Sequence, residues 1–126
     1  MSRLRTILVV AAGLVMIASS AAHSLLGWPP LSARLAAVNA PVDLVSGLAL
    51  GWHFAGLAML TLGLLVLWLA SVAQRSVSVR VPVGVIGVAY VAFAASAAAA
   101  FGFDFIEVVF LTPGVLLTAA ALAPGQ

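Results

Sequence analysis

The sequence predicts an all-α integral membrane protein, a bundle of four antiparallel transmembrane helices with its N and C termini in the cytoplasm. Three observations support this fold class: the composition, four long apolar stretches and the uneven distribution of arginine. Of the 126 residues, 65% are hydrophobic and only 6% are charged, and the mean hydropathy is +1.30. A soluble domain carries about a quarter charged residues because its surface must stay hydrated. The outer surface of this chain is therefore expected to face lipid.

The chain is expected to form one domain over residues 1–126, since its length leaves no room for a second. It contains no cysteine, which excludes disulfides, thiolate metal sites and cysteine nucleophiles. Its net charge of +2 comes from five arginines that are spread along the chain. A nucleic-acid-binding protein shows instead a basic patch or stripe, so we expect no nucleic-acid partner.

Four apolar stretches are long enough to cross a bilayer as helices. A membrane helix needs about 20 predominantly apolar residues to span a hydrocarbon core of about 30 Å. The stretches cover about residues 6–26, 50–72, 81–101 and 105–123. Helices are expected because lipid offers the backbone no hydrogen-bond partners, and a helix satisfies its own amides. Pro113 removes one of these bonds and is expected to kink the fourth helix.

The orientation follows from the arginines, which are enriched in the cytoplasmic segments of membrane proteins. Four of the five lie on one predicted side: Arg3 and Arg5 before the first span, and Arg75 and Arg80 between the second and third. The other side carries Arg34 together with Asp43, Asp104 and Glu107. The arginine-rich side is therefore predicted to be cytoplasmic, and the expected location is a bacterial inner membrane.

The first outer connection, residues 27–41, is the longest of the three. Within it, residues 31–38 are predicted to form a short helix that lies on the membrane surface. Pro29 and Pro30 are suited to begin this helix, and Pro41 is suited to follow its end.

The N-terminal segment also has an interpretation as a cleavable signal peptide. Two arginines, an apolar core of about a dozen residues and the small residues 20–22 match the pattern of such peptides. Cleavage after residue 22 would leave His23 as the N-terminus, able to chelate a metal through its amine and its ring. The apolar run continues to Leu26, however, which favours an uncleaved first helix.

Two histidines and two carboxylates are predicted to lie at the outer membrane boundary. Counting about 20 residues along the first and second spans places His23 and His53 there. Asp104 and Glu107 flank the outer start of the fourth span. Imidazole and carboxylate together suit zinc, manganese or iron, so these four residues are candidate metal ligands.

The histidines allow two further chemistries at the same boundary. On neighbouring helices, His23 and His53 are candidate cofactor-binding residues, as axial ligands of a haem. With Glu107 they also suit proton transfer to a quinone or the binding of a lipid-like substrate. The inner half of every predicted span is almost purely apolar, so any pocket is expected to open toward the outer face.

Each of these residues has a plainer interpretation. A histidine near a membrane boundary is more often an interfacial residue or a hydrogen-bonding partner between helices. Asp104 at a helix start is more often an N-cap, and Glu107 completes an acidic first turn that the helix dipole favours. The sequence contains no HExxH, P-loop or GxGxxG motif. No catalytic residue is therefore assigned.

Short length, few charges and small residues along the helices favour a role without catalysis. Gly47, Gly51, Gly56 and Gly63 are expected to let helices pack closely, inside the bundle rather than against a partner. We expect first an accessory or structural subunit of a larger membrane assembly, or a homo-oligomer. An outer-face metal, haem, quinone or lipid site ranks second. A small oligomeric transporter ranks third, because no span carries a charge near its centre.

Overall fold

All regular structure in residues 2–73, 78–103 and 105–123, the part that this computed structural model describes, is helical. The elements are α1 (Arg3–Ala22), the π-helix η1 (His23–Gly27), α2 (Trp28–Ala37), α3 (Val42–Val72), α4 (Arg80–Phe101) and α5 (Phe105–Leu122). Among the described residues, three continuous helices are long and apolar enough to cross a membrane: Arg3–Ala37, Val42–Val72 and Arg80–Phe101. Helix α5 is apolar but shorter. The predicted all-helical fold with membrane-type helices is confirmed at this level.

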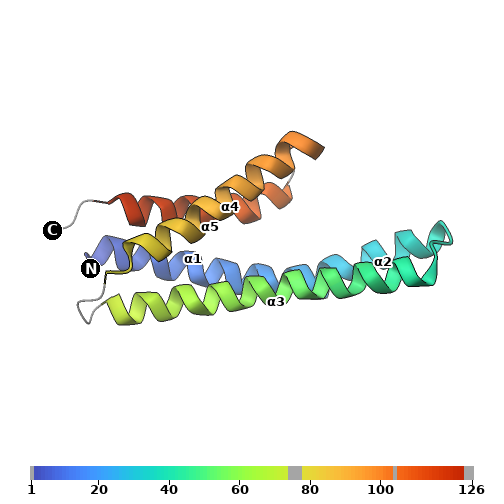
Figure 1. The fold of residues 1–126 in the computed structure, drawn as a ribbon, viewed down its shortest axis with the longest axis horizontal. Helices are drawn as coiled ribbons and strands as arrows, with labels where there is room; N and C mark the ends of the chain where they lie inside the picture. The colour runs from blue at the N-terminus through green and yellow to red at the C-terminus, as the bar shows by residue number, and fades with distance from the viewer. Residues whose placement is uncertain (1, 74–77, 104, 124–126) are drawn as a thin grey trace.

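Helices α1, η1 and α2 form one continuous rod, whereas the sequence had predicted a connection from residue 27 onward. Figure 1 shows α2 extending the line of α1. The rod has 35 residues and is about 52 Å long at 1.5 Å per residue, against about 30 Å of hydrocarbon. In a regular α-helix, Pro29 and Pro30 would clash with carbonyls one turn back. The wider π turn of η1, directly before them, accommodates both prolines without a break.

Helix α1 lies at the centre of the molecule. It packs against α3 and against α5, while α4 packs mainly on α5 and barely meets α3, as Figure 1 illustrates. The largest cluster of buried apolar side chains joins all four of these helices, with Val9, Met16, Val66, Val83 and Leu117 among its members. The first 22 residues therefore supply part of this core.

Glycines mark the closest approaches between helices. A Cβ on Gly13 of α1 would lie 3.2 Å from the carbonyl oxygen of Gly63 on α3. A Cβ on Gly87 of α4 would lie 3.0 Å from the carbonyl oxygen of Gly114 on α5. These distances leave no room for a larger residue, so backbone-to-backbone packing holds both helix pairs together.

The glycines in the N-terminal part of α3 behave differently. Nothing lies within 4 Å of a Cβ built on Gly47 or Gly51, so the expectation that these two serve packing inside the bundle is wrong. It is confirmed for Gly56 and Gly63, which are buried against the rod. Figure 1 gives the reason, because α2 and this part of α3 project beyond α4 and α5.

Two arginines bind the C-terminal end of α5. The guanidinium of Arg5, on α1, donates a hydrogen bond to the carbonyl of Ala123. Arg80, at the start of α4, donates from Nε to the carbonyl of Ala121 at 2.9 Å. Carbonyls at a helix end lack intrahelical donors and carry partial negative charge, so both contacts are favourable. Arg75 lies outside the described residues.

Candidate functional site

Two neighbouring cavities lie beside α3 and together form a cleft. The first lies between the rod of α1, η1 and α2, helix α3 and helix α5, and the second lies where α3 and α4 separate. The first has a volume of about 370 Å³ and is lined by residues that include Ser19, His23, Arg34, Trp52, Met59 and Phe110. The second has a volume of about 330 Å³ and is lined by residues that include His23, Met59, Leu62, Ala89, Tyr90 and Phe110. Three side chains line both cavities: His23, Met59 and Phe110. Each volume lies in the range of small-molecule binding sites.

His23 and Trp52 form the polar centre of this cleft. Their rings stack with centroids 4.3 Å apart and planes inclined by 8°. The indole Nε1 of Trp52 donates to the carbonyl of His23 at 2.8 Å, and Nε2 of His23 lies 3.1 Å from the carbonyl of Trp52. Because a carbonyl oxygen only accepts, Nε2 must carry the proton. In the neutral imidazole, Nδ1 is then left as an acceptor.

The local helix geometry explains why this pair forms. His23 begins the π-helix η1, whose hydrogen bonds skip one residue more than those of an α-helix. A Cβ on Gly27, at the end of η1, would lie 2.8 Å from the Trp52 ring, so glycine makes the space for the indole. Three residues before His23, the buried Ser20 hydroxyl donates to the carbonyl of Gly56 at 2.7 Å. These contacts hold η1 against α3 at a fixed register.

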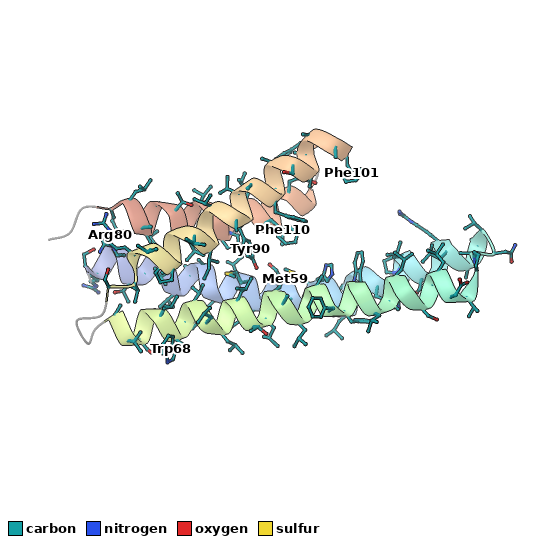
Figure 2. The ribbon with its side chains drawn as sticks, in the orientation of Figure 1. Met59, Trp68, Arg80, Tyr90, Phe101 and Phe110 are labelled. Carbon is teal, nitrogen blue, oxygen red and sulfur yellow. The ribbon has the colours of Figure 1, made fainter. Side chains whose placement is uncertain are left out.

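Tyr90 is the polar side chain of the second cavity. It is the only tyrosine in the chain and is 7% exposed. Its ring packs against Phe110 with centroids 5.9 Å apart. Its hydroxyl oxygen is buried and has no hydrogen-bond partner among the described residues. Figure 2 shows Tyr90 extending from α4 toward Met59 on α3, beside Phe110. A buried hydroxyl without a partner costs about 1–3 kcal/mol.

The rest of the cleft is apolar, with few polar groups. Ser19 and Arg34 line the first cavity, as does Val109 of α5. Pro113 lies four residues after Val109 inside α5 and has no N–H to donate to its carbonyl. An apolar cavity with a small number of polar groups is the usual character of a site for a small amphipathic molecule.

The histidines predicted from the sequence meet different partners. His23 stacks on Trp52, whereas the exposed His53 packs against Trp28 with ring centroids 5.7 Å apart. Trp28 and Trp52 are themselves 6.3 Å apart. Both imidazoles thus belong to one cluster of aromatic rings, in which indoles contact each of them.

The structure describes one of the two carboxylates in the predicted metal set. Glu107 is buried in the first turn of α5, 3% exposed, and Asp104 lies outside the described residues. Among the residues that the structure describes, no group of three or more His, Asp or Glu side chains is arranged to hold a metal ion. The metal set of His23, His53, Asp104 and Glu107, and the haem ligation by both histidines, stay predictions.

Two of the residues that define the cleft, Trp52 and Tyr90, were not among the site residues predicted from the sequence. Trp52 was not a candidate residue, although an indole N–H at that depth needs an acceptor. Tyr90 stands in a span made mostly of Ala, Val and Gly, and a single phenol in such a helix is a signal that was available. Its burial depends on how α4 packs, which spacing does not reveal.

Comparisons of this chain with known protein families, curated proteins and solved structures find no match. The observations that bear on function are therefore the position of the cleft, its mainly apolar lining and its polar side chains, among them His23, Trp52 and Tyr90.

Proposed function

We propose that this protein binds a small, amphipathic, lipid-soluble molecule in the cleft that these two cavities form beside α3. The observation that carries the proposal is that two apolar cavities of about 370 and 330 Å³ share the imidazole of His23. An apolar lining supplies affinity for the body of such a molecule, and one or two polar groups orient it. This role corresponds to the outer-face ligand site of the sequence analysis, in its quinone or lipid form.

The membrane placement is part of the same proposal. In this proposal the helices α1, α3, α4 and α5 cross a bacterial inner membrane as an antiparallel bundle, with both termini in the cytoplasm. The arginine distribution supports this orientation, as does the position of Arg5 and Arg80 at one end of the molecule, against the end of α5. The cleft then opens toward the outer half of the bilayer, where a ligand dissolved in lipid reaches it sideways.

The binding experiment uses the full chain in lipid nanodiscs and the probe 4-heptyloxyphenol, a neutral amphipathic ring compound. Calorimetric titration, with empty nanodiscs subtracted, is expected to show saturable binding near one probe per chain. Replacement of Ala89, which lines the second cavity, by Phe fills this space and is expected to weaken binding at least tenfold.

The matched control is Ala92→Phe on the same helix. Ala89 and Ala92 are both exposed alanines of α4, so both tolerate the larger ring, but Ala92 is not among the residues that line either cavity. Ala92→Phe is expected to bind as the unaltered protein does. Absence of saturable binding, or equal weakening by both substitutions, would contradict a ligand site in the cleft.

A second candidate function, an accessory or structural subunit, is favoured by the part of the molecule that projects beyond α4 and α5. Large apolar side chains there are exposed, with Leu50 at 76% and Leu44 at 50%. The open space over Gly47 and Gly51 leaves room for a helix of another chain. Small residues on an open helix face let a second membrane helix approach closely.

Size-exclusion chromatography with light scattering tests this second candidate. A subunit that self-associates has a protein mass that is a multiple of 12.7 kDa in mild detergent. Gly51→Phe, which blocks the open face, is expected to return it to the monomer. A monomer at all concentrations, with no partner band in native gels of whole membranes, would count against this role.

A further inference from the structure

Two polar atoms beside the second cavity have opposite hydrogen-bonding requirements. The Tyr90 hydroxyl is buried without a partner among the described residues, and a phenol readily donates its proton. Nδ1 of His23 is an acceptor, because Nε2 is used toward the carbonyl of Trp52. Both side chains line the second cavity, of about 330 Å³. The residues that line this cavity therefore include one with a donor, buried at present, and one with an acceptor.

We propose that the ligand of the cleft is an aromatic alcohol of the quinol type, an inference that rests on the proposed binding function. One hydroxyl of the ring donates to Nδ1 of His23, and a second oxygen of the ring accepts from the Tyr90 hydroxyl. The ring itself packs against Phe110 and Phe93, which lie 4.7 Å apart between centroids and line this cavity. A hydrocarbon leaves both polar atoms unpaired, and an oxidised quinone has no proton for His23.

Met59 provides the movement that such a ligand requires. The Tyr90 oxygen is covered in the ligand-free protein, so an incoming ring must displace a neighbour. Met59 lines both cavities, and Figure 2 shows it facing Tyr90 from α3. Methionine has three rotatable bonds and adapts its shape at low cost. Rotation of Met59 thus exposes the hydroxyl and joins the two cavities into one site.

Three stable probes separate the two hydrogen bonds. The first, 4-heptyloxyphenol, carries a hydroxyl and an ether oxygen; 4-octylphenol carries the hydroxyl alone; 1-heptyloxy-4-methoxybenzene carries only acceptors. Calorimetry in nanodiscs is expected to rank 4-heptyloxyphenol first, with each of the other probes about tenfold weaker, the loss typical of one buried hydrogen bond.

Two substitutions assign the bonds to residues. Tyr90→Phe removes the donor and is expected to weaken 4-heptyloxyphenol about tenfold while leaving 4-octylphenol unchanged. His23→Gln retains a donor toward the Trp52 carbonyl but removes the Nδ1 acceptor. It is expected to weaken both phenols and to leave the dialkoxybenzene unchanged. Circular dichroism and the melting temperature of each variant confirm that it is folded.

The outcomes distinguish this inference from the binding function on which it rests. If the three probes bind equally well and neither substitution changes their ranking, the cleft binds apolar molecules and the quinol-type assignment is wrong. If none of the probes binds saturably to the unaltered protein, the binding function itself fails. The assignment stands only when Tyr90→Phe weakens the binding of 4-heptyloxyphenol but not of 4-octylphenol, and His23→Gln weakens the binding of both phenols but not of the dialkoxybenzene.

Discussion

His23 and Trp52 are joined by two hydrogen bonds and by a ring stack. The indole Nε1 donates to the histidine carbonyl at 2.8 Å, and the imidazole Nε2 lies 3.1 Å from the tryptophan carbonyl. The rings lie 4.3 Å apart and nearly parallel. The relationship fixes the position of η1 on α3 and the tautomer of the imidazole, and both properties lead to measurable predictions.

The first prediction concerns the tautomer of His23. We expect the neutral ring to carry its proton on Nε2, because the atom that it faces is a carbonyl oxygen, which only accepts. Nitrogen-15 NMR of histidine-labelled protein in nanodiscs distinguishes the two tautomers. In the variant His53→Gln, His23 is the only remaining histidine, so all histidine signals are assigned to it. Signals of an Nδ1–H tautomer would show that the contact between Nε2 and the Trp52 carbonyl is absent.

The second prediction compares alanine substitutions at two glycines, one against the Trp52 ring and one beside open space. In Gly27→Ala, the new methyl carbon would lie only 2.8 Å from the rigid Trp52 ring. We expect a loss of about 1–3 kcal/mol in unfolding free energy, the usual cost of overpacking. Gly51→Ala, into open space, should instead raise stability by up to about 1 kcal/mol, since alanine favours helix. SDS titration measures the unfolding free energy of both variants. Equal changes in the two would contradict the position of the Trp52 indole against Gly27.

The third prediction concerns the ligand-free state. Tyr90→Phe removes a hydroxyl that is buried without a partner among the described residues and retains the ring that packs on Phe110. We expect the variant to be more stable than the unaltered protein by about 1 kcal/mol, as measured by SDS titration of ligand-free protein. A loss of stability would show that the hydroxyl already has a partner, and the case for a ligand there would weaken.

The fourth prediction separates two arginines at the start of α1. Arg5 is 9% exposed and bonds the Ala123 carbonyl at the end of α5. Arg5→Ala is expected to cost about 2 kcal/mol of unfolding free energy, the range for a hydrogen bond from a charged group. Arg3→Ala, at an exposed position of the same turn, is expected to change stability by less than about 0.5 kcal/mol. Similar losses in both variants would contradict the bond from Arg5 to α5.

The sequence predicted the fold class because composition and apolar length are enough for it. A chain with 6% charged residues is expected to face lipid, and long apolar stretches in lipid are expected to be helical. The helix boundaries were harder to predict. Pro29 and Pro30 predicted a break before α2, but the π turn of η1 accommodates both and continues the helix. The one additional residue in each turn of a π-helix has no sequence pattern by which it could be predicted.

The candidate site was predicted only through His23. Depth along the helices placed this residue near the outer boundary, but depth does not determine the direction of a side chain around the helix. His53, one residue after Trp52, faces Trp28 at the surface, while Trp52 takes the position beside His23. Tyr90 lines the second cavity because α4 packs on α5 and separates from α3, an arrangement that helical periodicity does not specify.

Photo-crosslinking tests most directly whether the cleft is a ligand site. A 4-alkoxyphenol with a diazirine in its alkyl chain is added to the protein in nanodiscs, irradiated, and its attachment sites are mapped by mass spectrometry. We expect saturable labelling of Met59, Tyr90 and Phe93, and an excess of unlabelled 4-heptyloxyphenol should suppress it. Trp68, 58% exposed and far from Tyr90 in Figure 2, should show only non-saturating labelling from the lipid. Labelling that is uniform over the exposed helices, and that competitor does not reduce, would contradict the account.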